Sequence, residues 1–175
     1  TAFGAQSLLS NTASNNTAVG YQAGYSNNTG TSLAALGTFA LYANTTGIDN
    51  TAVGRNALSS NTTAQSNSAF GYYSLLSNTT GQYNTAYGSR SLQSNTTASN
   101  NTAVGYQAGY NTTTAGSNLF LGPYAGWRNV TGTYNTYVGA GTTCGFDMTT
   151  GSKNTIIGGY NGNQGGLDIR TSSNN

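Results

Sequence analysis

The sequence NTAVGYQAGY occurs twice in this chain, at residues 16–25 and at residues 101–110. Its central feature, an apolar residue followed by glycine, returns along the whole chain. The glycines of this column are Gly4, Gly20, Gly37, Gly54, Gly71, Gly88, Gly105, Gly122, Gly139 and Gly158. They are separated by a step of 16 residues, seven steps of 17 and a last step of 19. Such a constant period is typical of a solenoid, in which each repeat is one coil stacked on the next.

A period of 17 residues is too short for helical repeats, which need roughly 30 residues or more. It fits one coil of a β-solenoid with two short strands and two turns. Residues 51–53 (TAV) are typical of the first strand, and Gly54 allows a tight turn because glycine tolerates unusual backbone angles. Residues 56–60 (NALSS) are predicted to form the second strand. The NTTG sequence at 78–81 is predicted to form the second turn, because Asn, Thr and Gly favour turns.

The predicted fold is therefore all-β: a parallel β-roll of about ten coils. The repeat covers residues 1–158. Residues 159–175 depart from it and are expected to cap it or to begin another module.

The residue before each glycine is apolar in every copy and is predicted to form the core column of the solenoid. Its members are Phe3, Val19, Leu36, Val53, Phe70, Tyr87, Val104, Leu121, Val138 and Ile157. Small residues three positions after each of the first eight glycines are expected to face this column: Ser7, Ala23, Ala40, Ala57, Ser74, Ser91, Ala108 and Ala125.

A second apolar column precedes the first by one residue: Ala18, Ala35, Ala52, Ala69, Ala86, Ala103, Phe120, Tyr137 and Ile156. Because neighbouring strand residues point to opposite faces, the strand is apolar on both faces. Strands of this kind are usually covered on both sides. This second column is therefore predicted to be a seam between chains.

Asparagine also repeats with the period, at residues 16, 50, 67, 84, 101, 118 and 135. Stacked asparagine amides can hydrogen-bond along the axis of a fibre, so this column predicts a ladder. A second set of asparagines begins N-x-S/T sequons in one register: Asn27, Asn44, Asn61, Asn78, Asn95 and Asn129. Turn formation is the favoured explanation of this set, with a ladder of glycans as the alternative.

The composition excludes most kinds of chemistry. The chain has no His and no Glu, and its acids are Asp49, Asp147 and Asp168, so the usual groups for acid–base catalysis at neutral pH are missing. Cys144 is the single cysteine. The sequence predicts no enzyme, no cofactor and no metal site. Charged residues are 5% of the chain and the cations are scattered, so nucleic acid is not an expected partner. Membrane insertion is not expected either, since no apolar run approaches ~20 residues.

The NTAVGYQA units, joined by SNTTG-like turns, resemble the repeats of phage tail fibres and related bacterial surface fibres that occur with endosialidase-type chaperone domains. They are more distantly similar to the head repeats of YadA-like trimeric autotransporter adhesins. The resemblance implies a left-handed parallel β-roll, a homotrimer, and a location outside the cell on a virion or a bacterial surface. The adhesin repeat is shorter, so the NTTG turn would be an enlarged loop.

The expected function is a stiff segment of such a fibre, its shaft or head, serving attachment to a host or surface. A host-surface glycan or a protein is the expected receptor, and Trp127 with Arg128 is the candidate contact. The alternative is a single-chain solenoid that binds ice or carbohydrate through a face of Thr17, Thr51, Thr85, Thr102 and Thr136.

Overall fold

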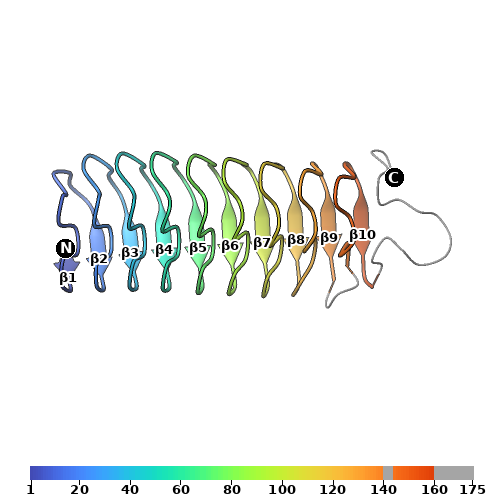
Figure 1. Cartoon of the computed structure of the whole chain (residues 1–175), viewed down its shortest axis with the longest axis horizontal. Helices are drawn as coiled ribbons and strands as arrows, with labels where there is room; N and C mark the ends of the chain where they lie inside the picture. Colours follow the sequence, from blue (N-terminus) through green and yellow to red (C-terminus); the bar gives the residue numbers. More distant parts are fainter. Residues whose placement is uncertain (140–143, 160–175) are drawn as a thin grey trace.

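The computed structural model describes residues 1–139 and 144–159, which form a β-solenoid of stacked coils, as the period predicts (Figure 1). The strands are β1 (Ala2–Phe3), β2 (Thr17–Val19), β3 (Ala34–Leu36), β4 (Thr51–Val53), β5 (Ser68–Phe70), β6 (Thr85–Tyr87), β7 (Thr102–Val104), β8 (Leu119–Leu121), β9 (Thr136–Val138) and β10 (Thr155–Ile157). The described residues contain no helix. Most of the segment 159–175, predicted to end the repeat, lies outside them.

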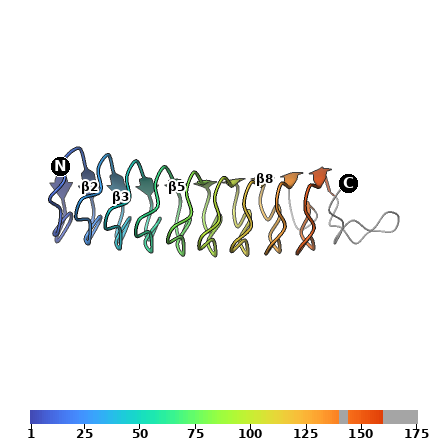
Figure 2. The same cartoon turned by 90° about the horizontal axis from the view of Figure 1, so that it is seen from above.

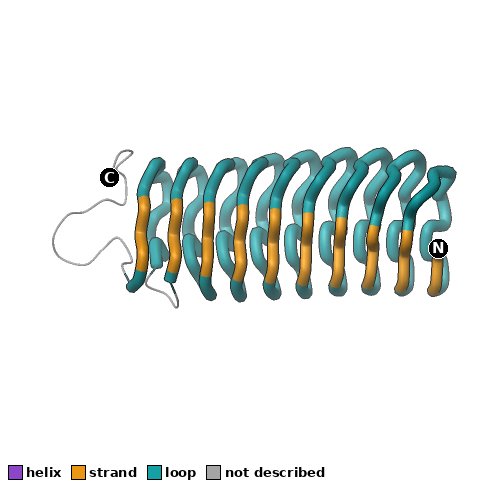
Figure 3. The backbone as a smooth tube through the Cα atoms, turned by 180° about the vertical axis from the view of Figure 1, so that it is seen from behind, coloured by secondary structure: helices purple, strands orange, loops and turns teal. Residues whose placement is uncertain are grey.

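The ten strands form one parallel sheet in which each strand pairs with the next along the chain. Ala52 pairs with Ala35 on one side and with Ala69 on the other, so the partners are one repeat apart. The register holds across the longer last step, where Ile156 pairs with Tyr137. All the strands lie in one row along one side of the stack (Figures 2 and 3). The prediction of a parallel β-roll is confirmed.

The predicted second strand is wrong, because each coil has one strand and not two. Residues 55–60 form consecutive turns. Asn56 and Leu58 have φ angles of 59° and 50°, which lie in the left-handed region and interrupt an extended chain. The segment still joins its neighbour through the backbone, since the amide of Leu58 donates to the carbonyl of Ser74 at 3.1 Å.

The two apolar columns lie on the opposite faces from those predicted. The predicted core column points outward: Phe3, Val19, Leu36, Tyr87, Leu121 and Ile157 are exposed, and Val53, Phe70, Val104 and Val138 are half-buried. The predicted seam points inward: Ala18, Ala35, Ala52, Ala69, Ala86, Ala103, Phe120, Tyr137 and Ile156 are each at most 4% exposed. Both assignments were wrong. A column enclosed within its own coil cannot be a seam between chains.

The width of the coil explains this reversal. In a three-residue strand, the middle side chain points away from the face that carries the first and third. The interior also receives the small column after the glycines, which is buried from Ala23 to Ala125 as predicted. It receives a third column as well, four residues after each glycine, in which Leu41, Leu58, Leu75 and Leu92 are fully buried. Leucine from one side leaves room for only alanine on the strand, so the larger valine column lies outside.

The glycine column forms the corner after each strand, as predicted. Gly4, Gly20, Gly37, Gly54, Gly71, Gly88, Gly105, Gly122 and Gly158 have φ angles between 97° and 138°. Gly139 is the member of the predicted column that does not have a positive φ angle.

In two coils a large ring replaces the alanine of the strand, and a glycine replaces the leucine that would otherwise fill the same space. Phe120 and Tyr137 stand in the alanine column, and both are fully buried. The leucine position of their coils is occupied by Gly126 and, because the last step is two residues longer, by Gly145. A Cβ atom at Gly145 would lie 2.6 Å from the ring of Tyr137, and one at Gly126 would overlap the ring of Phe120. The large ring on the strand is thus accommodated by a glycine on the opposite side of the same coil.

Replacing Phe120 with alanine is expected to lower the free energy of unfolding by about 3–5 kcal/mol, because it leaves a cavity. The double variant Phe120→Ala with Gly126→Leu restores the pairing seen at Ala86 and Leu92, and it should recover part of this loss. Gly126→Leu alone should be destabilising. Urea unfolding of the three variants measures these differences. A double variant less stable than Phe120→Ala would show that the two side chains do not share one space.

Candidate interaction surfaces

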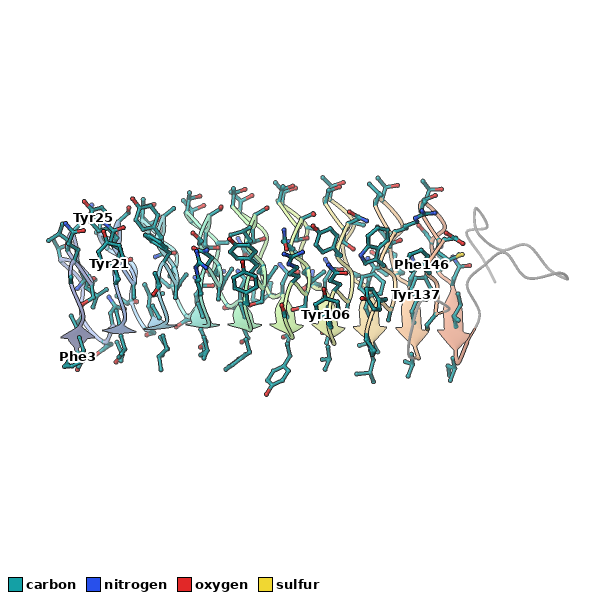
Figure 4. All side chains as sticks on the ribbon, turned by 60° about the horizontal axis from the view of Figure 1, so that its bottom comes forward. Phe3, Tyr21, Tyr25, Tyr106, Tyr137 and Phe146 are labelled. Atoms are coloured by element: carbon teal, nitrogen blue, oxygen red, sulfur yellow. The ribbon has the colours of Figure 1, made fainter. Side chains whose placement is uncertain are left out.

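The outward apolar column runs along the whole sheet, from Phe3 on β1 to Ile157 on β10. It projects from the strands on the side away from the coil interior, beginning at Phe3, whereas Tyr21 and Tyr25 lie on the other side (Figure 4). Tyr87 is 60% exposed, and its ring stacks on Phe70 of the neighbouring strand with centroids 5.6 Å apart. No member of the column is charged. The sheet therefore presents a continuous uncharged strip to its surroundings.

The same face carries the first residue of each strand, two positions before the apolar column. Six of these are threonines: Thr17, Thr51, Thr85, Thr102, Thr136 and Thr155. The others from β2 onward are Ala34, Ser68 and Leu119. The outer face thus consists of a mainly hydroxyl-bearing column beside an apolar one.

The predicted asparagine ladder exists inside the coil. The Oδ1 atom of Asn50 accepts the backbone amide of Asn67 at 3.0 Å, and that of Asn67 accepts the amide of Asn84 at 2.9 Å. The side-chain nitrogen of Asn67 donates to the carbonyl of Gly81 at 2.9 Å. Each amide therefore joins its own coil to the coils next to it. These contacts satisfy buried polar groups that would otherwise be costly.

The sequon asparagines form a second ladder, which was not predicted. The Nδ2 of Asn44 donates to Oδ1 of Asn27 at 2.8 Å, and that of Asn61 donates to Oδ1 of Asn44 at 2.8 Å. The six members at 27, 44, 61, 78, 95 and 129 are fully buried. A glycan cannot be attached to these side chains in the folded chain. The ladder and the turn explain the sequons without glycosylation.

Trp127 and Arg128, the predicted contact, belong to an aromatic stack. The indole lies between Tyr110, 5.9 Å away, and Phe146, 5.0 Å away, with both rings nearly parallel to it. The guanidinium of Arg128 lies 5.3 Å from the centre of the Phe146 ring and donates to Asp147 at 2.8 Å. Both faces of the indole are therefore occupied by neighbouring rings. The stack supports structural packing, and the receptor contact stays a prediction.

Another row of rings, here called the aromatic corner, comes from the two positions that follow the glycine column. Its members are Tyr21, Phe39, Tyr72, Tyr73, Tyr106 and Tyr124. They form three close pairs with centroids 5.5, 3.9 and 5.3 Å apart, in that order. Which of these rings pair depends on which coils are neighbours and on the position of each ring after its glycine.

Among the described residues, no group of three His, Cys, Asp or Glu side chains is placed to hold a metal ion. No helix in this part of the chain is long and apolar enough to span a membrane. Part of the glycine-rich sequence 139–145 lies outside the described residues. Cys144 is fully buried, as expected for a small apolar side chain.

The thiol of Cys144 is expected to resist alkylation in the folded protein. Burial raises its pKa from the ordinary 9.0 to about 11, so the thiol is neutral at pH 8 as well as enclosed. Because the folded-state pKa is the higher one, the protonated thiol contributes stability below pH 9 that is lost as the pH rises through about 11. Iodoacetamide at pH 8, with mass detection, should label the chain in urea and not in buffer. Labelling at equal rates in both would contradict the burial.

A comparison of the chain with protein-family models, with curated proteins and with solved structures finds no match. The fold itself defines the class, a single-sheet β-solenoid repeat protein.

Proposed function

We propose that this chain is a segment of an attachment fibre, on a phage tail or a bacterial cell surface, in which three copies associate along their length. The observation that carries the proposal is the outward apolar column. It crosses all ten strands without a charge, over about 43 Å at a ~4.8 Å strand spacing.

A second copy of the chain is the natural occupant of this strip. With three-residue strands about 10 Å long, the outer face of the sheet covers on the order of 400 Å², which is about the size of the largest exposed patch on a typical soluble protein, a patch that is often functional. Identical coils also give every copy the same spacing, so side chains of one chain meet those of another in register along the whole stack. Each coil adds contact area, so the association of the chains becomes more stable as the repeat grows longer.

The mechanism proposed is mechanical. Backbone hydrogen bonds join every coil to the next, and the two asparagine ladders add side-chain bonds between most of them, so the stack resists bending and extension. The fibre would hold its receptor-binding part at a distance from the particle or cell that carries it. A host-surface glycan or protein is the proposed receptor.

The mass of the purified chain in solution tests the assembly. One chain is 17.9 kDa, so light scattering should give three times 17.9, or 53.7 kDa. Replacing both Val53 and Tyr87 with lysine should convert the trimer to monomers, because it places like charges along the strip. Thr63→Lys adds a charge on an exposed turn and should leave the mass unchanged. A wild-type mass of one chain would contradict the proposal.

The second candidate, a single-chain solenoid that binds ice or carbohydrate, is favoured by one observation. Six of the nine strands from β2 onward begin with a threonine on the outer face. A monomeric chain that shows thermal hysteresis, lost in Thr85→Lys, would support it. The large side chains of Phe70 and Tyr87 beside those threonines make the face uneven, which favours the fibre.

A further inference from the structure

Two arginines and two tyrosines lie together at the centre of the aromatic corner. Arg55 follows β4, Tyr72 and Tyr73 follow β5, and Arg90 follows β6, so the cluster spans three consecutive coils. Backbone bonds fix this alignment: the amide of Tyr73 donates to the carbonyl of Arg55 at 3.1 Å, and the amide of Arg90 donates to that of Tyr72 at 2.8 Å. Arg55 and Tyr72 are exposed, and Tyr73 and Arg90 are half-buried.

The tyrosine pair is held in one arrangement. The two rings stack with centroids 3.9 Å apart, and the guanidinium of Arg55 lies 5.9 Å from the centre of the Tyr72 ring. A hydrogen bond with Tyr72 lowers the pKa of the Tyr73 hydroxyl, and the charges of Arg55 and Arg90 both lower it further. Both cations therefore act on the same hydroxyl.

No carboxylate neutralises this cluster within residues 1–139 and 144–159. The salt bridge found there joins Arg128 to Asp147, and neither Arg55 nor Arg90 takes part in it. The cluster is a concentration of positive charge on a chain with few charges. Guanidinium groups form paired hydrogen bonds with carboxylates, which makes arginine well suited to bind them.

The neighbouring rings indicate what carries the anion. Along the same corner, the Tyr21–Phe39 pair lies toward the N-terminus and the Tyr106–Tyr124 pair toward the C-terminus. At ~4.8 Å a coil, the three pairs are separated by about 10 to 15 Å. Flat apolar rings with polar tips suit the faces of sugar rings. A row of them along an axis matches a linear polymer of such rings better than a compact ligand.

We propose that this corner binds a carboxylated polysaccharide lying along the solenoid axis, with Arg55 and Arg90 on its carboxylates and the tyrosines against the sugar rings. The proposal does not depend on trimer formation. It assigns a ligand to a surface on which the fibre proposal places none.

Binding of galacturonic acid oligosaccharides to the full chain, measured by calorimetry, tests the site. The methyl ester of the same oligosaccharides keeps the rings without the charge, and polyphosphate keeps the charge without the rings. The acid form should bind, and both comparison ligands should bind at least about tenfold more weakly, because each lacks one half of the interaction. Equal binding of the ester, or of polyphosphate, would overturn the proposal.

The variant Arg55→Gln with Arg90→Gln should weaken binding of the acid form about tenfold or more. Arg128→Gln removes an arginine that is already paired, and it should bind as the wild type does. Tyr72→Leu should also weaken binding, whereas Tyr83→Leu changes an exposed tyrosine outside the corner and should not. An equal loss of affinity in Arg128→Gln or Tyr83→Leu would show that the ligand binds nonspecifically, through net charge or exposed aromatic surface. Light scattering of each variant should give the wild-type mass, so a failure of this site is separable from a failure of the fibre proposal.

Discussion

Replacing Gly71 with alanine is expected to cost at least about 3 kcal/mol of unfolding free energy. Gly71 has a φ of 137°, where residues with a Cβ atom are strained. Its Cβ would lie 2.6 Å from the carbonyl carbon and oxygen of Gly88 in the next coil. These are backbone atoms of an equally constrained corner, so they cannot move aside without breaking the register.

Gly158→Ala is the matched control for this prediction. Gly158 belongs to the same column and has a φ of 97°, but a Cβ atom there would meet nothing within 4 Å. The Gly158→Ala variant should therefore lose the unfolding free energy that backbone strain costs, without the further loss from a Cβ atom that collides with the next coil. Urea unfolding of both variants measures the difference. Equal losses at the two positions would mean that the contact between coils does not limit the corner.

Replacing Asn61 with alanine is expected to cost about 3–5 kcal/mol, since each unpaired buried polar group costs roughly 1–3 kcal/mol. The Nδ2 of Asn61 donates to Oδ1 of Asn44 at 2.8 Å and to the carbonyl of Ala64 at 3.2 Å. Its Oδ1 accepts from Asn78 at 3.1 Å. The substitution leaves the amides of Asn44 and Asn78 without these partners in an interior that water does not reach.

The stability of Asn61→Ala is compared with that of Thr63→Ala, an exposed change two residues away in the same turn. The control should stay within about 0.5 kcal/mol of the wild type. Thermal unfolding followed by circular dichroism provides the measurement. A loss below about 1 kcal/mol for Asn61→Ala would indicate that the ladder adds little beyond the backbone bonds.

The period and the parallel stacking of the coils could be predicted because one glycine column fixes both, whereas the presence of one strand per coil, and so of a single sheet, was not predicted. Apolarity alone could not predict which side chain of each strand points into the coil, since Val53 and Ala52 are both apolar. What decides it is the width of the interior, which depends on Leu58 pointing inward from a position with positive φ. Sequence patterns assign such φ angles to glycine or asparagine, so the leucine column was missed and the segment was read as a strand.

The residues of the candidate surfaces can be predicted from the sequence only in part. Arg55, Tyr72, Tyr73 and Arg90 are scattered in the chain, but they become neighbours once the sequence is written in rows of 17. The stacking of Trp127 between two rings needs coordinates, because it depends on ring orientation rather than on spacing.

The large rings of Phe120 and Tyr137 have a consequence for folding. Coils that are nearly identical can pair out of order, since a strand displaced by one whole repeat finds almost the same partners. Phe120 fits only where Gly109 and Gly126 leave space; next to the coil of Leu92 its ring would meet that side chain instead. The pairs of a ring and a glycine thus fix the order of the C-terminal coils, whereas the alanine-and-leucine coils that precede them carry no such difference from one another.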